Sequence, residues 1–540
     1  MITGRMGIYL NPGNRGFWES VRSKVYVDKT GLIACTNELL STKEKYICVS
    51  RPRRFGKSMA LEMLAAYYGR GCDSRDLFAG LKIEEQESFP KYLNRYDVIY
   101  LNMQQFLIEA APGKATEYLE QEVLEELSEE YRDILQGRDM GLAAALRKIY
   151  VKTDKQFIFL IDEWDCIMRE RQESEALQRQ YLDFLRNLLK DQQYVALVYM
   201  TGILPVKKYG LHSALNMFRE YSMTNQRNFE EYTGFTEEEV KALCQRFGMD
   251  FAEASSWYDG YKFKRFRHVY NPKSVVEAMI CGEYSNYWTA TETYEALKIY
   301  IDMDFDGLRA DIVQMLGGGC VRINTRSFQN DMRNLRTKDD VLTLLIHLGY
   351  LAYDSEREEA FIPNKEIAGE FENAMSVSGW PEIMRILKAS DKLLKDTLDG
   401  DGDSVAKGLD QAHTEVASIL TYNDENSQFL SDELLGKNLL AAIGLAYYSA
   451  RKDYRLIREL PSGKGFADVV FLPLPAVKKP ALVVELKYDM TVNAAIQQIR
   501  DRHYTQALEG YTGEILAVGI NYDRDDANKH HSCVIERMKK

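Results

Sequence analysis

The feature that most constrains the fold of this chain is an apolar strand that runs through a basic loop into a helix. Tyr46–Ser50 (YICVS) has strand character, residues 56–58 read GKS, and Met59–Tyr68 has helical composition. A loop of the pattern GxxxxGK[ST] between a strand and a helix binds phosphate, because its backbone N–H groups and the helix N-terminus face the anion. Arg51 replaces the first Gly of the pattern. The sequence therefore predicts a phosphate-binding loop with one substitution.

Eight residues of this loop are the expected nucleotide contacts. Gly56 lets the backbone approach the phosphates, the Lys57 ammonium reaches the β and γ oxygens, and the Ser58 hydroxyl ligates Mg²⁺. Lys207 and Lys208 are further candidate phosphate contacts, although a solvated basic rim fits them, Arg53 and Arg54 equally well. A basic loop that only starts a helix is the alternative for the whole segment. The predicted nucleotide-binding residues are Arg51, Pro52, Arg53, Arg54, Phe55, Gly56, Lys57 and Ser58.

Two later apolar runs end in polar residues that suit the same ligand. Phe157–Asp165 (FIFLIDEWD) delivers Asp162 and Glu163 at the end of a strand. Asp162 suits a contact with Mg²⁺ or its water, and Glu163 suits orientation of the attacking water. The run Tyr194–Thr201 ends in Thr201, which either senses the γ-phosphate or begins a plain turn. ATP and Mg²⁺ are therefore the expected cofactors.

Apolar runs that alternate with helical patterns predict a parallel α/β sheet in the first half of the chain. From about residue 235 the composition becomes mostly helical, and Thr236 followed by three acids marks a helix start. A strand pair is expected near 349–353 and 360–363. The expected strands of the first half lie at 46–50, 97–103, 157–162 and 194–201, with long helices at 115–136 and 175–189.

The last 120 residues return to an α/β pattern. We expect a helix at 439–450, strands at 465–472 and 481–487, a helix at 492–508 and a final strand at 514–520. The chain is thus expected to comprise a P-loop core at 1–235, a mostly helical lid region at 236–375, a helical connector at 376–420 and a restriction-endonuclease-like α/β domain at 421–540.

Composition excludes several classes of protein. No apolar run approaches 18 residues, which argues against a membrane span, and the first residues lack the apolar stretch of a signal peptide. Eight scattered Cys without a CxxC pair argue against a zinc ribbon and for a reducing cytoplasm. The net charge is −12, but residues 421–540 contain 16 basic and 16 acidic residues. This balance disfavours tight non-specific coating of DNA and still permits a local phosphate-binding groove.

A second group of candidate catalytic residues lies near the C-terminus. Asp468 ends the run GKGFAD, and Glu485 and Lys487 follow in VVELK. On adjacent strands, the two carboxylates can converge on one Mg²⁺. Residues two apart on a strand share a face, so the Lys487 ammonium lies beside the expected metal-bound water. The alternative is a strand edge with an ordinary ion pair. This spacing favours a metal-dependent nuclease with Asp468, Glu485 and Lys487 in its site.

Two other patterns imitate metal sites. Asp399–Asp403 (DGDGD) resembles a calcium loop, but Ser404 and Asp410 occupy positions that such a loop fills with Gly and Glu. We read it as a helix connection capped by Ser404. The pair His530-His531 lacks a third ligand, so a solvated tail is the preferred interpretation.

Motifs in the first part of the chain resemble the predicted AAA-ATPase-like family of bacteria. They are YVDKT at 26–30, SRPRRFGKS at 50–58, FLIDE at 159–163, WYDGY at 257–261, YNP at 270–272, LGY at 348–350 and PNK at 363–365. The resemblance covers roughly residues 7–370. The family commonly has the Gly-to-Arg change in its loop, so the resemblance implies nucleotide binding despite Arg51.

The C-terminal motifs resemble the PD-(D/E)XK nuclease superfamily, in the form found fused to that ATPase-like family. The matching stretches fall within about 421–520 and include GKGFAD at 463–468 and ELK at 485–487. The resemblance implies Asp468 and Glu485 as metal ligands and Lys487 as the catalytic lysine. It also implies that Glu425 or Glu459 can supply an extra acid and that Gln498 and Tyr504 can complete the site.

Together these motifs predict an ATP-binding protein whose nucleotide state gates Mg²⁺-dependent hydrolysis of nucleic acid. DNA is the preferred substrate, and a homo-oligomer is left open. The alternative is an ATP-dependent switch whose nuclease-like domain binds DNA or protein without cutting. An ATPase whose remodelling activity is primary is a third possibility. Intact Asp468, Glu485 and Lys487 favour the enzyme, whereas Arg51 and the acidic net charge leave room for the switch.

Overall fold

The structure is a computed structural model that divides into two compact units. Unit 1 comprises residues 1–247, 260–283 and 324–358, and unit 2 comprises 248–259, 284–323 and 359–540. The residues described are 5–136, 140–172, 174–206, 215–225, 229–288, 294–303, 305, 307–328, 335–378, 380–420, 440–462, 465–474, 477–501, 508, 511–523 and 531–538. Among them, no helix is long and apolar enough to cross a membrane.

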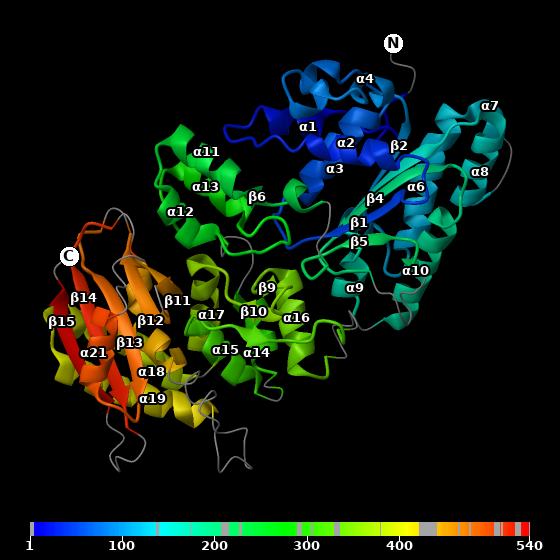
Figure 1. Ribbon diagram of the computed structural model, residues 1–540. Coiled ribbons are helices and arrows are strands. Elements are labelled where there is room, and N and C mark those ends of the chain that lie inside the picture. The colour runs from blue at the N-terminus through cyan, green and yellow to red at the C-terminus, as the bar shows by residue number, and fades with distance from the viewer. Residues whose placement is uncertain are drawn as a thin grey trace. The chain divides into compact units, whose positions relative to one another are not determined.

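Unit 1 is built on a parallel five-stranded sheet in the order β2-β3-β4-β1-β5 (Figure 1). Every residue of β1, β3 and β4 is buried, which explains their continuous apolar sequences. The strands are β1 (Tyr46–Ser50), β2 (Asp97–Asn102), β3 (Phe157–Asp162), β4 (Val195–Gly202) and β5 (Arg219–Tyr221). The parallel α/β sheet predicted from the sequence is confirmed, and β5 is an additional edge strand.

Alternate residues of these strands enter separate cores on the two faces of the sheet. Phe157 and Phe159 join one core with α5, α6, α8 and α10, whereas Ile158 and Leu160 join the other with α2 and α3. The helices of this region are α1 (Arg15–Val21), α2 (Gly31–Leu39), α3 (Lys57–Tyr68), α4 (Phe89–Tyr92), α5 (Met103–Glu109), α6 (Ala115–Glu130), α7 (Arg132–Leu135), α8 (Leu142–Thr153), α9 (Cys166–Glu170) and α10 (Glu175–Leu189).

The single helix expected at 115–136 is wrong, because Tyr131 separates α6 from α7. The Tyr131 hydroxyl donates to Asp97 Oδ2 at 2.5 Å and accepts from Arg70 Nη2 at 3.2 Å. Arg70 also pairs with Asp97 at 2.6 Å. This buried tertiary network holds Tyr131 out of helical geometry, which local helix propensity cannot predict.

The rest of unit 1 comes from later segments of the chain. These are β6 (Phe235–Thr236), α11 (Glu237–Phe247), β7 (Val269–Tyr270), α13 (Pro272–Cys281), α16 (Lys338–Leu348) and β9 (Ala352–Asp354). As expected, Thr236 starts α11, and its hydroxyl accepts from Glu239 N at 3.4 Å.

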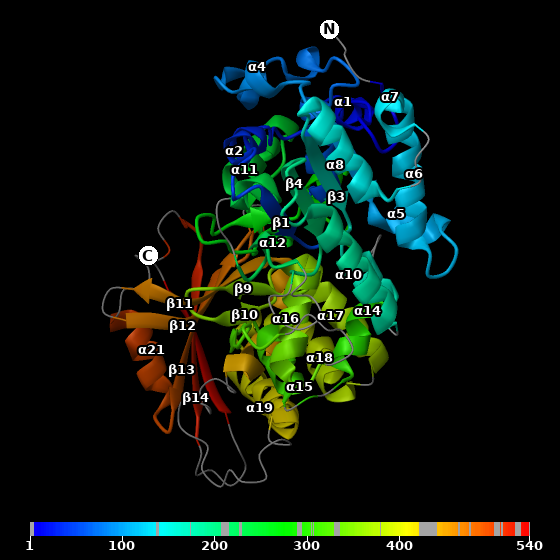
Figure 2. The same cartoon turned by 90° about the vertical axis from the view of Figure 1, so that its right-hand side faces the viewer.

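Unit 2 combines helices with a mixed five-stranded sheet in the order β11-β12-β13-β14-β15 (Figure 2). Of its neighbouring pairs, β13 and β14 are parallel and the other three are antiparallel. The strands are β11 (Tyr454–Ser462), β12 (Gly465–Pro473), β13 (Ala481–Tyr488), β14 (Ile515–Tyr522) and β15 (His531–Met538). This sheet agrees with the predicted restriction-endonuclease-like α/β domain.

The remaining elements of unit 2 are mostly helical. They are α12 (Phe251–Tyr258), α14 (Tyr294–Ile301), α15 (Leu308–Leu316), α17 (Lys365–Ser378), α18 (Pro381–Asp399), α19 (Gly402–Leu420) and α21 (Val492–Asp501), with an antiparallel pair β8 (Val321–Arg322) and β10 (Glu359–Phe361). Ile496 and Ile499 of α21 pack against Val483 and Ala517 of the sheet.

The prediction that β14 is the final strand is wrong. β15 follows it and pairs with it along its whole length. The solvated-tail interpretation of His531 is therefore also wrong, because its side chain is 1% exposed and its Nδ1 lies 2.7 Å from Asp410 Oδ1. His530 lies outside the described residues.

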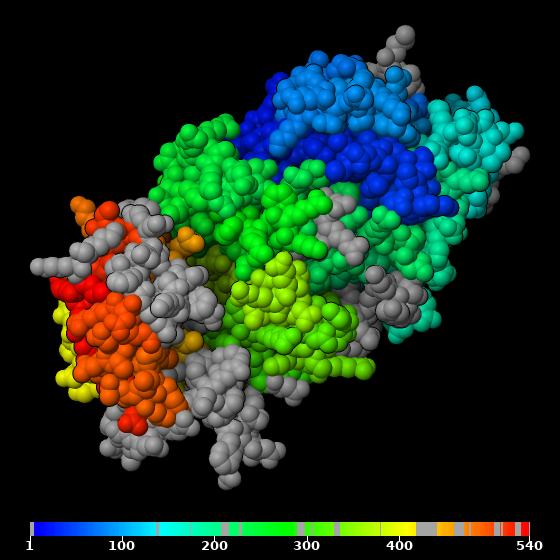
Figure 3. Space-filling model, in the orientation of Figure 1, coloured from blue at the N-terminus to red at the C-terminus, as the bar shows by residue number. Residues whose placement is uncertain are grey.

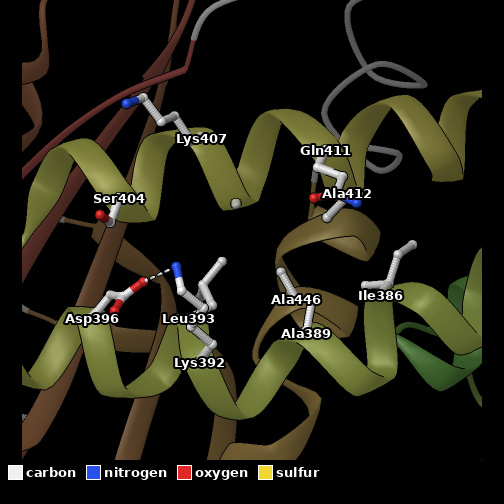
Figure 4. A pocket seen from close by; sticks show the side chains of 11 residues that line it. Ile386, Ala389, Lys392, Leu393, Asp396, Ser404, Lys407, Gln411, Ala412 and Ala446 are labelled. Carbon is white, nitrogen blue, oxygen red and sulfur yellow. Dashed lines mark hydrogen bonds and ion pairs between the residues drawn. The ribbon is translucent and has the colours of Figure 1, made fainter.

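The DGDGD segment is a helix connection, as predicted, although a different residue caps the helix. α18 ends at Gly400, whose φ is +82°, and Asp401 Oδ1 accepts from Ser404 N at 3.0 Å. Asp401 rather than Ser404 is therefore the capping side chain. Between α18 and α19 lies a pocket of about 200 Å³, whose lining mixes apolar side chains such as Ile386 and Leu393 with polar ones such as Asp396 and Lys407 (Figure 4).

Candidate nucleotide and nuclease sites

The predicted phosphate loop connects β1 to α3 in the geometry that the pattern requires. Gly56 precedes α3 with a φ of +83°, and a Cβ there would meet no atom within 4 Å. Glycine is therefore favoured by backbone conformation rather than by lack of space. Lys57 is 5% exposed, and its Nζ donates to Arg51 O at 3.1 Å and Pro52 O at 2.9 Å. Burial lowers the pKa of Lys57, while Glu163 and Asp162 oppose that shift.

Three oxygen-bearing side chains meet at the carboxyl ends of β3 and β4. The Ser58 hydroxyl donates to Asp162 Oδ2 at 2.6 Å, and the Thr201 hydroxyl donates to Asp162 Oδ1 at 2.5 Å. Asp162 is 2% exposed and Thr201 is fully buried. A hydroxyl beside a carboxylate is a hard-oxygen donor set that suits Mg²⁺, which retains several waters in such sites. The structure thus brings together the three residues that the sequence placed on three separate segments.

Glu163 lies beside this group and is held by an arginine that the sequence analysis missed. Arg169 donates to Glu163 Oε2 and, at 3.1 Å, from Nε to Asp165 Oδ2. Asp165 in turn accepts from the backbone N–H groups of Ile203 and Leu204. Burial raises the pKa of Glu163, while Lys57 and Arg169 act to lower it. The i, i+4 spacing of Asp165 and Arg169 was the only signal in the sequence.

A pocket of about 680 Å³ in unit 1 lies beside the phosphate loop and Glu163. Arg53, Arg54, Phe55, Gly56, Lys57, Ser58 and Glu163 all line it. The lining residues do not include Arg51, Pro52, Asp162 or Thr201. Asp162 is nevertheless hydrogen-bonded to Ser58, which does line the pocket. Within unit 1, Figure 3 shows residues of the N-terminal segment in blue beside green residues of the segment that carries α11 and α13.

The Arg51 side chain faces the interior rather than the pocket. It is fully buried, and its Nη1 donates to Ser50 O at 2.9 Å and Tyr221 O at 2.8 Å. Its guanidinium lies 4.7 Å from the centre of the Phe263 ring. Burial lowers the pKa of Arg51 to about 10. In this geometry the Arg51 side chain is held by two backbone carbonyls and does not line the pocket. Lys207 and Lys208 lie outside the described residues.

The second candidate site lies on β13 of unit 2. Val469 pairs with Val484 in antiparallel register, so Asp468 and Glu485 adjoin the same cross-strand pair. Glu485 is 2% exposed. Lys487 Nζ donates to Glu485 Oε1 at 3.0 Å and to Gln498 Oε1 at 2.5 Å, and Gln498 Nε2 also donates to Glu485 Oε1. Lys487, Glu485 and Gln498 therefore form a closed hydrogen-bonded group.

Other predicted residues of this site are only partly described. Asp468 and Glu459 lie on β12 and β11, but their side chains are outside the described set, as are Glu425 and Tyr504 entirely. Within the described part of the chain, no three His, Cys, Asp or Glu side chains gather to hold a metal. The described oxygens of Glu485 and Gln498 suit a hard divalent cation. β14 adds Asn521, which lies in register with Lys487 and was not predicted.

Two protein families match the segments that contain most of these candidate residues. The family described as "Predicted AAA-ATPase" matches residues 19–212. The PD-(D/E)XK nuclease superfamily matches residues 438–532.

One curated relative is an uncharacterized protein in the vnfD 5′ region of Azotobacter chroococcum mcd 1, 27% identical over 277 residues. The match covers 50% of this chain and 51% of the relative, so the chain spans about half the length of the curated relative it matches.

Two solved structures are similar at low sequence identity. A Walker-type ATPase of Pyrococcus abyssi is 12% identical, with a TM-score of 0.33 and coverage of 64% of this chain and 94% of the other. The ORC2 protein of Aeropyrum pernix is 11% identical, with a TM-score of 0.26 and coverage of 68% and 98%. The family matches confirm the resemblances that the motifs predicted: residues 19–212 are similar to predicted AAA-ATPases, and residues 438–532 are similar to the PD-(D/E)XK nuclease superfamily.

Proposed function

We propose that unit 1 binds ATP with Mg²⁺ and that unit 2 hydrolyses phosphodiester bonds of nucleic acid, with the nucleotide state controlling cleavage. The observation that carries the proposal is the Ser58–Asp162–Thr201 group at the end of the phosphate loop. A hydroxyl from the loop and a carboxylate from a neighbouring strand are the ligands that nucleotide-bound Mg²⁺ uses in P-loop proteins.

Each residue of the first site has a distinct role in this proposal. Lys57 exchanges the carbonyls of Arg51 and Pro52 for phosphate oxygens when ATP enters. Ser58 and Asp162 would hold a magnesium ion, which would neutralise phosphate charge when bound. Glu163 orients and deprotonates the attacking water.

The residues of the second site suit a metal-dependent nuclease. Glu485, together with Asp468, would hold the divalent cation, which supplies charge neutralisation at the scissile phosphate. The Lys487 ammonium, held by Glu485 and Gln498, positions the nucleophilic water and offsets developing charge. We propose nucleic acid as the substrate, since this charge arrangement suits a polyanionic backbone, and DNA is the preferred form.

The test is cleavage of plasmid and single-stranded DNA, and of RNA, with Mg²⁺ in the presence and absence of ATP. We expect Mg²⁺-dependent cleavage that changes with ATP, no ATP response in Lys57→Ala, and no cleavage in Glu485→Gln. A cleavage rate that is the same with and without ATP would contradict the proposed control of cleavage by the nucleotide. A protein that binds ATP and nucleic acid but cuts no substrate would support a binding switch, and a Mg²⁺-induced thermal shift abolished by Glu485→Gln would show separately whether the metal binds.

A further inference from the structure

Helix α1 and the residue that caps it carry a cluster of two arginines around a tryptophan. The Arg15 Cζ lies 4.0 Å from the centre of the Trp18 ring, and the Arg22 Cζ lies 4.2 Å from it. Spacings of three and four residues place these side chains on one face of the helix. The neighbouring Phe17 is buried and stacks on Phe78, with ring centres 4.9 Å apart. The core contact of Phe17 anchors α1 and leaves Trp18 half-buried at the surface.

A second cluster of the same kind lies at the end of α11. The Phe247 ring is half-buried, and its centre lies 5.7 Å from Lys24 Nζ and 5.2 Å from Arg246 Cζ. Arg246 Nη2 also donates to Lys24 O at 3.1 Å, which ties the end of α11 to the segment that follows α1. Since one residue separates Arg22 from Lys24, their Cα atoms are at most about 7 Å apart. The two clusters therefore form one surface, which we call the α1–α11 surface: Arg15, Trp18, Arg22, Lys24, Arg246 and Phe247.

This surface is basic in a chain whose net charge is −12. Arg22, Lys24 and Arg246 are exposed, and none of them pairs with a carboxylate among the residues that the structure describes. By contrast, Lys29 on the same segment pairs with Glu239 of α11 at 2.6 Å. Cations that gather without carboxylates repel one another until an anion joins them. The α1–α11 surface therefore suits a negatively charged partner.

A nucleotide in the pocket beside the phosphate loop does not account for this surface. Lys24 lines that pocket of about 680 Å³. The pocket lining does not include Trp18, Arg22, Arg246 or Phe247. The α1–α11 surface thus borders the pocket but extends beyond it, so most of its charge is left for a partner other than the bound nucleotide.

The aromatic rings between these cations distinguish one kind of polyanion from the others. An acidic peptide can pair with the cations but supplies few flat groups for the rings, and a DNA duplex keeps the faces of its bases in the stack. A single strand offers both phosphates and free base faces, which stack on aromatic rings and on guanidinium planes. The α1–α11 surface combines the two kinds of group that such a strand requires.

We propose that the α1–α11 surface binds single-stranded nucleic acid. A base stacks on Trp18 in place of a guanidinium, and a second base stacks on Phe247. The displaced guanidinium and the neighbouring cations then pair with phosphates. The inference rests on the proposed function for the choice of substrate, and it adds a strand-binding surface on the nucleotide-binding unit.

The test measures binding of a short fluorescein-labelled oligothymidylate by fluorescence anisotropy, on the full chain and with EDTA to prevent metal-dependent cleavage. Arg22→Gln and Arg246→Gln should each weaken binding about three- to tenfold and reduce the slope of log affinity against log salt by about 0.7, the value for one phosphate contact on a single strand. Lys155→Gln is the matched control and should leave binding unchanged. Lys155 is also exposed, and its Nζ lies 5.2 Å from the centre of the Tyr131 ring, which belongs to the core on the other face of the sheet from Phe17.

Substitutions of Trp18 test the stacking contact separately from charge. Trp18→Leu should weaken binding about fivefold or more, because it removes a ring on which a base stacks. Trp18→Phe retains a ring and should recover most of that loss. An unlabelled strand should quench the tryptophan fluorescence of wild type and quench that of Trp18→Phe less. The melting temperature of each variant shows whether α1 still packs, and Trp18→Phe carries the test if Trp18→Leu is destabilised.

The outcomes separate this inference from the proposed function. If wild type binds no strand and cuts none, both fail. If wild type cuts nucleic acid but the variants of Arg22, Arg246 and Trp18 bind the strand as Lys155→Gln does, the strand-binding surface is overturned and the nuclease stands. If only the cation variants weaken binding, the surface recognises charge alone, as for an acidic peptide, and the assignment to a single strand is overturned. Weakening in both kinds of variant supports the inference, whether or not the chain cuts the strand.

Discussion

The two candidate sites use a nearly buried lysine in different ways. Lys57 rests on two backbone carbonyls of its own loop, whereas the Lys487 ammonium already contacts the Glu485 carboxylate. Phosphate oxygens can replace neutral carbonyls on Lys57 with a gain in charge pairing. A cation that binds Glu485 must instead share a carboxylate with an ammonium. Under the proposed function, Lys57 would therefore exchange neutral partners for an anion, whereas Lys487 would share its carboxylate partner with a cation.

The supports behind the two sites differ as well. Behind the phosphate loop lies the buried guanidinium of Arg51, whose Nε and Nη2 have no hydrogen-bond partner among the residues that the structure describes. Before Glu485, the strand residues Ala481–Val484 are all fully buried and apolar. A buried polar support is sensitive to charge and pH, whereas an apolar strand is sensitive mainly to packing volume.

The largest expected effect concerns the glutamate of the first site. Glu163→Gln should slow ATP hydrolysis by roughly 10²–10⁴-fold, because the amide cannot accept the proton of the attacking water. ATP affinity should stay within a few-fold, since the phosphate contacts lie on the loop. Single-turnover hydrolysis and equilibrium binding measure the two quantities separately. Hydrolysis at the wild-type rate would show that Glu163 is not the base.

The lysine of the second site gives the matching test. Lys487→Ala should reduce cleavage by roughly 10²–10³-fold through loss of one charge-stabilising contact. It should retain or strengthen the Mg²⁺-dependent thermal shift, because its ammonium no longer competes for Glu485. Cleavage rate and melting temperature with and without metal are the readouts. A variant that cuts normally would remove the assigned role, and a lost metal shift would contradict the competition.

A substitution of Arg51 distinguishes the phosphate contact predicted from the sequence from the buried contact with Ser50 O and Tyr221 O. Arg51→Met should lower the free energy of unfolding of unit 1 by about 1–3 kcal/mol, because Ser50 O and Tyr221 O lose a charged donor. ATP affinity should change less than threefold, since the side chain does not line the pocket. Chemical denaturation and calorimetry check both statements. A large loss of affinity at unchanged stability would restore the predicted phosphate contact.

The smallest effect is a pH dependence behind the same loop. His347 of α16 is buried, and burial together with the positive charge of Arg51 lowers its pKa to about 3. The unfolded chain binds a proton near pH 6.5 that the folded chain does not, so stability is present above that pH and falls as the pH drops below it.

Between pH 7.5 and 5.5 this histidine should cost about 1 kcal/mol of unfolding free energy. His347→Phe retains an aromatic ring beside Phe328. It should reduce the difference between the unfolding free energies at pH 7.5 and pH 5.5 by that amount. Denaturant unfolding of both proteins at the two pH values is the measurement. Identical pH dependence in wild type and variant would mean that the pKa of His347 is the same in the folded and the unfolded chain.

Most of the secondary structure was predictable from local patterns. Fully apolar runs gave β3 the bounds 157–162 and helical periodicity gave α10 the bounds 175–189, as predicted. The break at Tyr131 was not predictable, because a hydrogen bond to Asp97 on a distant strand decides it. β15 was missed because its alternation of polar and apolar residues is weak, and its pairing with β14 is a tertiary contact that the local pattern does not show.

The chemical groups that the chain offers can be read directly from its residues: the GKS loop, the Asp162–Glu163 pair and the Glu485–Lys487 spacing. Local backbone rules place such groups on strand ends and helix starts. Only the tertiary structure decided that Arg51 turns inward, that Arg169 holds Glu163, and that α13 brings Ile280 to the loop. The physical reason is that burial, hydrogen-bond satisfaction and apolar contact depend on neighbours far apart in the chain.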